Sequence, residues 1–80
     1  MEIRVGSIVK SASGHDKGIY HAVVKLEGDF AYIADGKHRH IDNPKKKRLK
    51  HLKPTNAYTD TADITDKKLR NLLREYNYPV

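Results

Sequence analysis

The sequence predicts a mainly β fold in which five short strands close into a small barrel, followed by one amphipathic helix. Two observations support this prediction. Short runs of β-branched and aromatic residues alternate with glycine-containing turns through residues 5–53, and apolar residues recur at helical spacing only after residue 64. Eighty residues are enough for one domain, and closing the strands into a barrel would remove most exposed sheet edges.

The first two strands are expected at residues 5–11 and 19–27, where β-branched residues are frequent. In the second strand the even-numbered positions are apolar, so they would face the core and His21 would face solvent. Gly28 then suits the first central position of a two-residue type II′ turn, which predicts a β-hairpin to the next strand.

The third strand is expected at residues 30–35, and its buried face is ambiguous. Alternation places Phe30 and Tyr32 on one face and Ala31 and Ile33 on the other. Both pairs are apolar enough to be buried, so the pattern alone leaves the two orientations open.

After Gly36 the chain becomes strongly basic and its strands are harder to place. Residues 38–42 are expected as a short charged strand at a sheet edge. Residues 43–48 are expected as a loop, because Pro44 lacks a backbone donor and four adjacent cations repel one another. Two leucines within residues 49–54 indicate a last short strand or turn that fixes this loop to the core.

The chain is interpreted as a single domain with a barrel over residues 1–55, a linker over 56–64 and a helix over 65–77. Thr65 is a natural N-cap, and Pro79 forbids continuation of the helix. We expect the helix to pack on the barrel, with a partner-binding role as the alternative. Its apolar stripe follows helical spacing through Leu69, Leu72, Leu73 and Tyr76.

Composition excludes several classes of protein. The absence of cysteine rules out a disulfide framework and a thiolate zinc site. Charges interrupt the first 18 residues, which excludes a signal peptide, and no apolar run approaches membrane-spanning length. A domain this small has little room for a deep active-site cleft. We therefore expect a cytoplasmic protein that is not an enzyme and has no cofactor, small-molecule substrate or membrane partner.

The stretch SGHDKG, residues 13–18, contains two glycines but does not fit an enzyme motif. A Walker A loop needs four residues between its glycines and a helix after it, whereas here three residues separate the glycines and a strand follows. No third orienting group is identifiable for a catalytic pair of His15 and Asp16. We expect a turn shaped by its glycines, in which Asp16 bonds to backbone amides and His15 and Lys17 point outward.

The excess positive charge is confined to residues 37–53. This segment holds eight Lys and Arg residues and one acid, whereas the remaining residues have a net charge of −1. A compact domain with its cations on one side is suited to a polyanion, although a solvated charge run or a localisation tract remains the alternative. With the loop residues, the candidate RNA contacts are His15, Lys17, Lys37, Arg39, Lys45, Lys46, Lys47, Arg48, Lys50 and Lys53.

The aromatic residues and histidines do not favour a base-stacking surface or a metal site. The single phenylalanine and several tyrosines are expected in the core, which leaves Tyr58 as the best candidate for a free aromatic, although packing in the linker is favoured there too. We therefore expect recognition of folded RNA through its backbone and shape. His38 and His40 would point the same way on a strand, but two histidines without a third ligand make a poor metal site.

The stretch GSIVKSASGHDKGIYHAVVKL resembles the KOW motif, a strand followed by a G-x-D-K-G turn and a second strand. Together with ADGK and KKKRLKHLKPT, the pattern over residues 3–55 is similar to small bacterial KOW-domain RNA-binding proteins and to large-subunit ribosomal proteins of the fourteen-e type. The resemblance implies an SH3-like barrel that binds RNA, ribosomal RNA in particular, with the loop after the first strand meeting nucleic acid or protein. Its landmarks are Gly6, Val9, Ser11, Gly14, Asp16, Lys17 and Gly18, with Val23 and Val24 after them.

A protein-interaction module is the alternative function. In that case the basic segment would meet an acidic surface of a ribosomal protein or of a transcription-elongation partner, and the loop or the helix would determine specificity. Partner proteins that remain bound after nuclease treatment would distinguish this function from RNA binding.

Overall fold

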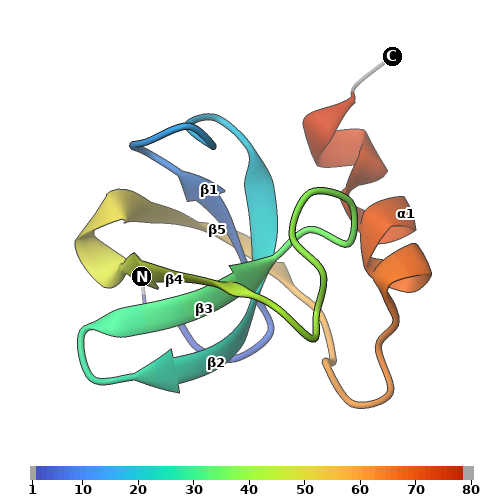
Figure 1. The fold of residues 1–80 in the computed structure, drawn as a ribbon, viewed down its shortest axis with the longest axis horizontal. Helices are drawn as coiled ribbons and strands as arrows, with labels where there is room; N and C mark the ends of the chain where they lie inside the picture. The colour runs from blue at the N-terminus through green and yellow to red at the C-terminus, as the bar shows by residue number, and fades with distance from the viewer. Residues whose placement is uncertain (1, 79–80) are drawn as a thin grey trace.

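The computed structural model describes residues 2–78, so the expected role of Pro79 lies outside the described residues. Five strands, one short 3-10 helix and one α-helix make up the described part (Figure 1). In chain order the elements are β1 (Ser7–Ser11), β2 (Tyr20–Glu27), β3 (Phe30–Ala34), β4 (Lys45–Arg48), η1 (Leu49–His51), β5 (Leu52–Tyr58) and α1 (Asp66–Asn77).

The five strands form one antiparallel sheet in the order β4-β3-β2-β1-β5. The sheet curls around its interior, but its edge strands β4 and β5 do not pair with each other within the described part of the chain (Figure 1). The expected closure of the barrel is therefore incomplete, and η1 connects the two edges. The mainly β content and the C-terminal helix are confirmed, and the arrangement is consistent with a small SH3-like fold.

The sheet buries apolar residues on both of its faces, because α1 packs against the outside of the curl. The cluster inside the curl comprises Val9, Val23, Ala31, Ile33 and Leu52. The cluster between the sheet and the helix comprises Ile8, Ala22, Ala34, Leu69 and Leu73. Successive residues of a strand therefore enter different cores, which explains the three consecutive buried residues in β1, residues 7–9, and in β2, residues 21–23.

The expected orientation of β2 is wrong at His21, which is 1% exposed instead of facing solvent. Ala22 lies beneath α1, and His21 and Val23 point to the other side of the sheet, so both faces are covered here. A register shift between Val23 and Lys25 then ends the alternation, and the last residues of β2 are exposed. The hairpin at Gly28 is confirmed by its φ of 56° and by the two-residue link.

The basic segment folds differently from the prediction. Residues 38–42 are not a strand, because the preceding Asp35 side chain accepts hydrogen bonds from three consecutive backbone N–H groups and closes a loop. Conversely, the predicted loop contains β4, because Lys45–Arg48 pairs with β3 and continues the sheet. Ala31 and Ile33 of β3 are buried inside the curl, so Phe30 and Tyr32 lie on the outer face of the strand, the same face on which Ala34 is buried beneath α1.

The helix begins as expected, with the Thr65 side chain accepting a hydrogen bond from the backbone N–H of Lys68. At its other end, the Asn77 side chain bonds to both the N–H and the C=O of Tyr20, at 2.7 and 3.1 Å, and fixes the helix to β2. The expected apolar stripe is wrong at Leu72, which is 41% exposed. No helix in residues 2–78 is long and apolar enough to cross a membrane.

Gly36 permits the close approach of the helix to the sheet. Its φ is +79°, and a Cβ at this position would lie 2.3 Å from the backbone oxygen of Asp66. Asp66 also accepts a hydrogen bond from the backbone N–H of Ile41, so the start of α1 and the loop after β3 are joined. β5 extends to Tyr58, three residues beyond the predicted end of the barrel.

Candidate functional site

Strand β4 divides the basic run between two faces of the sheet. Lys45 and Lys47 point toward Asp16 in the loop after β1, whereas Lys46 and Arg48 lie on the outer face beside Phe30. This division follows from strand alternation, which the loop prediction for this segment did not include. The four adjacent cations therefore have two different environments.

Asp16 joins the loop after β1 to β4. Its carboxylate accepts hydrogen bonds from the Lys47 ammonium group and from the Ser11 hydroxyl, and the Lys45 Nζ lies 3.4 Å from Oδ2. Burial raises the pKa of Asp16, but the hydrogen bonds from Lys47 and Ser11 outweigh this effect and lower it from 3.8 to about 2. The Asp16 carboxylate therefore bonds to other side chains, whereas the sequence predicted bonds to backbone amides.

Lys47 was expected to contact RNA, but the structure places it inside the protein. Its side chain is 7% exposed, and its Nζ donates both to Asp16 and to the backbone oxygen of Ser13, the latter at 2.6 Å. A charge that is buried and paired in this way stabilises the loop and is not available to a ligand. The expected role of Lys47 as a surface contact is therefore wrong.

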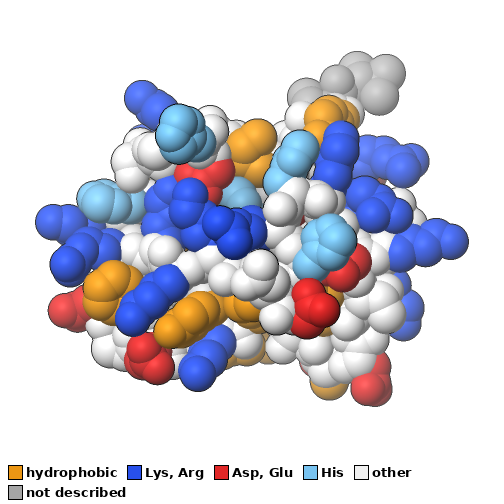
Figure 2. Space-filling model, viewed as in Figure 1, with side chains coloured by type: hydrophobic (Ala, Val, Ile, Leu, Met, Phe, Trp, Pro, Cys, Tyr) orange, Lys and Arg blue, Asp and Glu red, His pale blue; other side chains and the backbone are white. Residues whose placement is uncertain are grey.

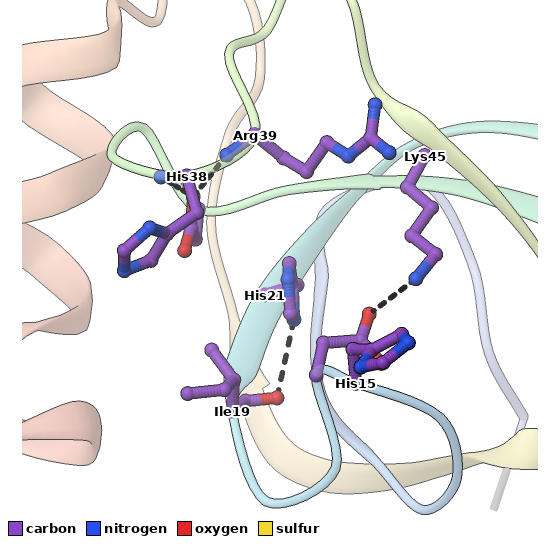
Figure 3. Close-up of a pocket in the computed structure, with 8 residues that line it drawn as sticks. His15, Ile19, His21, His38, Arg39 and Lys45 are labelled. Atoms are coloured by element: carbon purple, nitrogen blue, oxygen red, sulfur yellow. Dashed lines mark hydrogen bonds and ion pairs between the residues drawn. The ribbon is translucent and has the colours of Figure 1, made fainter.

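A cavity of about 300 Å³ lies where the loop of residues 13–18 meets the loop of residues 35–39. Figure 3 shows the Arg39 side chain extending toward Lys45, with His15 on the opposite wall and His38 beside Arg39. The cavity brings together side chains that are far apart in the sequence. Its lining comprises His15, Asp16, Ile19, His21, Asp35, His38, Arg39 and Lys45.

His21 belongs to this wall and was not predicted as a site residue. Its ring Nδ1 lies 3.1 Å from the backbone oxygen of Ile19, and since a carbonyl oxygen only accepts, Nδ1 is the protonated nitrogen. Burial lowers the pKa of His21 and keeps the ring neutral at physiological pH. The neutral ring leaves Nε2 as an acceptor. His21 becomes recognisable as a residue of the cavity wall only in the folded protein, where it lies close to the residues of the turn.

Asp35 fixes the loop that presents His38 and Arg39. Its Oδ1 accepts from the backbone N–H groups of Lys37, His38 and Arg39 at 2.8–3.0 Å. Burial alone would raise the pKa of Asp35, but these amide hydrogen bonds lower it below its usual value. The Arg39 backbone oxygen in turn accepts from the N–H groups of Asp35 and Gly36. Both the backbone N–H and the backbone C=O of Arg39 are therefore hydrogen-bonded, which fixes the main chain from which its guanidinium extends.

Phe30 and Tyr32 are half-buried on the outer face of the sheet, which corrects the expectation that Phe30 lies in the core. Lys46 Nζ lies 4.5 Å and Arg48 Cζ 4.9 Å from the centre of the Phe30 ring. Lys25 Nζ lies 5.2 Å from the centre of the Tyr32 ring. The exposed half of the basic run is thus interleaved with aromatic rings.

A second group of cations, which the sequence analysis did not predict, lies around one hollow beside α1. Lys37 lies there and not at the cavity, with its Nζ 2.9 Å from the Tyr78 hydroxyl. Arg70 and Arg74 line the same hollow, and the Arg70 side chain donates to the backbone oxygen of Gly36. On the face of the molecule drawn in Figure 2, basic side chains lie near the middle and again over α1. The cations of residues 37–53 therefore do not form a single patch.

The remaining predicted RNA contacts, Lys17, Lys50 and Lys53, lie outside the cavity. Lys17 is exposed next to His15 in the loop, and Gly14 and Gly18 have the expected positive φ values. Lys50 is exposed in η1 and Lys53 in β5. These lysines can add charge around the site, but they do not line the cavity.

A metal site is not formed among the described residues. Within residues 2–78 no three His, Asp or Glu side chains are placed to hold a metal ion. His38 lines the cavity, whereas His40 Nδ1 lies 3.7 Å from Asp66 Oδ2 at the start of α1. Two carboxylates line the cavity, and both have partners within the protein. The other polar groups of the lining, a guanidinium, an ammonium group and imidazoles, are suited to an anion.

The comparisons with known proteins give no further assignment. No protein-family model matches the chain, and no curated protein matches it.

Proposed function

We propose that this chain binds structured RNA without catalysing a reaction, and that ribosomal RNA in the cytoplasm is its target. The observation that supports this proposal most is the convergence of two separate loops and one strand on a single cavity. His15, Arg39 and Lys45 come from these three segments and meet there. The resemblance to the KOW motif points to the same loop.

Phosphate groups are the ligands that the cavity suits best. Arg39 can donate two parallel hydrogen bonds to a phosphate, and Lys45 adds a point charge beside it. On the outer face, Lys46 and Arg48 continue the positive surface along β4. Lys50 follows directly in η1, so an RNA backbone along this strand would meet successive cations.

The two acids at the cavity weaken this proposal less than their charge suggests. Asp16 is neutralised by the buried ammonium group of Lys47, so the charge of the neighbouring Lys45 is in excess. Asp35 is surrounded by three backbone N–H donors, each of which directs partial positive charge at it. Both carboxylates are therefore occupied by internal partners, and the exposed groups around them are cationic or imidazole.

The test compares two triple variants with the same change in charge. The site variant carries Arg39→Gln, Lys46→Gln and Arg48→Gln. The control variant replaces exposed lysines elsewhere, namely Lys10→Gln, Lys67→Gln and Lys68→Gln. Lys47 is left intact because its loss would disturb the loop.

The affinity for a ribosomal RNA hairpin is measured by fluorescence anisotropy at several salt concentrations. For about five neutralised phosphates, log K should fall with log salt with a slope near −4. The site variant should bind at least tenfold more weakly, with a slope flatter by about 2 to 3, and the control should change less than threefold. Equal losses in both variants would refute the site. Partner proteins that persist after nuclease treatment, with no RNA affinity, would refute the function.

A further inference from the structure

The outer face of β2, β3 and β4 forms a small grid of aromatic and charged side chains. In the register of the sheet, Tyr32 lies between Lys25 on β2 and Lys46 on β4. One row further along, Phe30 lies between Glu27 and Arg48. Directly opposed residues of antiparallel strands point to the same face, so each ring has a charged neighbour on both sides.

The two rings are not needed for either core. Both clusters of buried residues are complete without them, and on β3 it is Ala31, Ile33 and Ala34 that enter these clusters. Cross-strand and cation–π pairs would account for some stabilisation of the sheet, about 0.2 to 1 kcal/mol each. They do not require two aromatic residues at alternate positions of one strand.

The groups that cover the rings are long, flexible and exposed. Lys46 and Arg48 approach the Phe30 ring, and both are exposed side chains of an edge strand. A planar base can replace such a cation on the ring or stack on the Arg48 guanidinium. The displaced cation then remains within reach of the phosphate attached to that base.

We propose that this face binds an unpaired segment of RNA by stacking bases on Phe30 and Tyr32. The identification of the ligand as RNA rests on the function proposed above. The two Cα atoms are about 7 Å apart along the strand, so the RNA would lie along β3 with its bases splayed. Lys25, Lys46 and Arg48 would bind the flanking phosphates.

Glu27 is the one acid of the grid and opposes binding. Its carboxylate accepts a hydrogen bond from the Tyr32 hydroxyl at 3.2 Å, and it lies 3.6 Å from Lys46 Nζ and 3.9 Å from Lys25 Nζ. In the free protein it therefore occupies the two lysines that would meet phosphates. Replacing Glu27 with glutamine should free them and tighten the binding of a single strand by a few fold.

The test uses a ten-nucleotide single-stranded RNA that contains 2-aminopurine and a blunt duplex of the same length. Phe30→Leu removes the ring but keeps an apolar side chain, and Phe30→Tyr keeps a ring. Tyr58→Leu is the matched control, because the Tyr58 ring is accessible to solvent and has Arg4 4.4 Å from its centre, but lies on β5. Circular dichroism and thermal unfolding verify that each variant is folded.

Stacking predicts a loss of about five- to hundredfold in single-strand affinity for Phe30→Leu. The duplex affinity should change less than twofold, and Phe30→Tyr and Tyr58→Leu should bind as the unaltered protein does. Quenching of 2-aminopurine should accompany binding and disappear in Phe30→Leu. An equal loss for both RNAs, or no loss for either, would overturn the stacking inference alone. Failure of the unaltered protein to bind either RNA would overturn the proposed function as well.

Discussion

Replacing Asp16 with asparagine would test the connection between the loop after β1 and strand β4. The carboxylate is paired with Lys47, whose ammonium group is buried, and with Lys45 at the edge of the cavity. The substitution would keep the shape of the side chain but remove its charge. Lys47 would then have only neutral acceptors, namely the amide oxygen of the substituted side chain and the backbone oxygen of Ser13, and no charged partner.

The size of the effect follows from the pKa of Asp16. Because the side chain is only 15% exposed, solvent screens the interaction little. A fall of the pKa from 3.8 to about 2 corresponds to about 2.4 kcal/mol of stability at neutral pH. Removing one partner of a buried pair also leaves the other charge uncompensated, which brings the expected loss for Asp16→Asn to about 3 to 5 kcal/mol. An 80-residue domain has about 4 to 12 kcal/mol in total.

The pH dependence has a definite sign. A carboxylate whose pKa is lower in the folded state stabilises the protein above its unfolded pKa, and this contribution is lost as the pH falls through the folded value. For Asp16 the loss should be about 1 kcal/mol at pH 3 and about 2 kcal/mol at pH 2. Asp35 also has a lowered pKa, so the comparison needs the difference between the variant and the unaltered protein.

Urea unfolding of both proteins at pH 7, 5, 4 and 3 measures this difference. The gap in unfolding free energy should be largest at pH 7 and narrower by about 1 kcal/mol at pH 3. The exposed Asp42→Asn should change stability by less than about 0.5 kcal/mol. Adding Lys47→Met to Asp16→Asn should restore much of the loss, because an apolar side chain removes the unpaired charge. A gap that is absent at pH 7, or that stays constant with pH, would refute the reasoning.

Two further predictions concern the docking of the helix. Leu69→Ala should cost about 2 to 5 kcal/mol in thermal or urea unfolding because Leu69 is fully buried, whereas Leu72→Ala should cost less than about 0.5 kcal/mol. Equal costs would mean that the helix packs through a different face. Gly36→Ala would place a Cβ 2.3 Å from the Asp66 oxygen at a positive φ, so we expect a loss of about 2 kcal/mol or more. Amide hydrogen exchange in α1 should then accelerate, and unchanged protection would contradict the close approach.

The sequence was most informative where local chemistry determines structure. The cap at Thr65, the hairpin at Gly28 and the positive φ values of Gly14 and Gly18 depend on single residues and their immediate neighbours. The structure confirms all of them. The class of fold followed from such local features, because many short strands and one helix leave few arrangements for a chain of this length.

The sequence was less informative where burial depends on contacts between distant segments. His21 is buried because the two faces of β2 are both covered, which its alternation pattern cannot indicate. Lys47 is buried because Asp16, 31 residues earlier, lies opposite β4. Phe30 was assigned to the core because it is apolar, but Ala31 and Ile33 of the same strand face that core instead. The cavity likewise exists only after two loops meet.

An NMR titration of the isotopically labelled protein with a ribosomal RNA hairpin containing an unpaired loop tests the central claim most directly. Backbone amide shifts should change in residues 13–18 and 35–39 and along β3 and β4, and should remain small around Leu72 on the exposed side of α1. Shift changes centred on α1 would contradict the claim that the two loops and strands β3 and β4 form a nucleic-acid interface. The absence of any shift change at RNA concentrations high enough to saturate a cationic site would contradict it too.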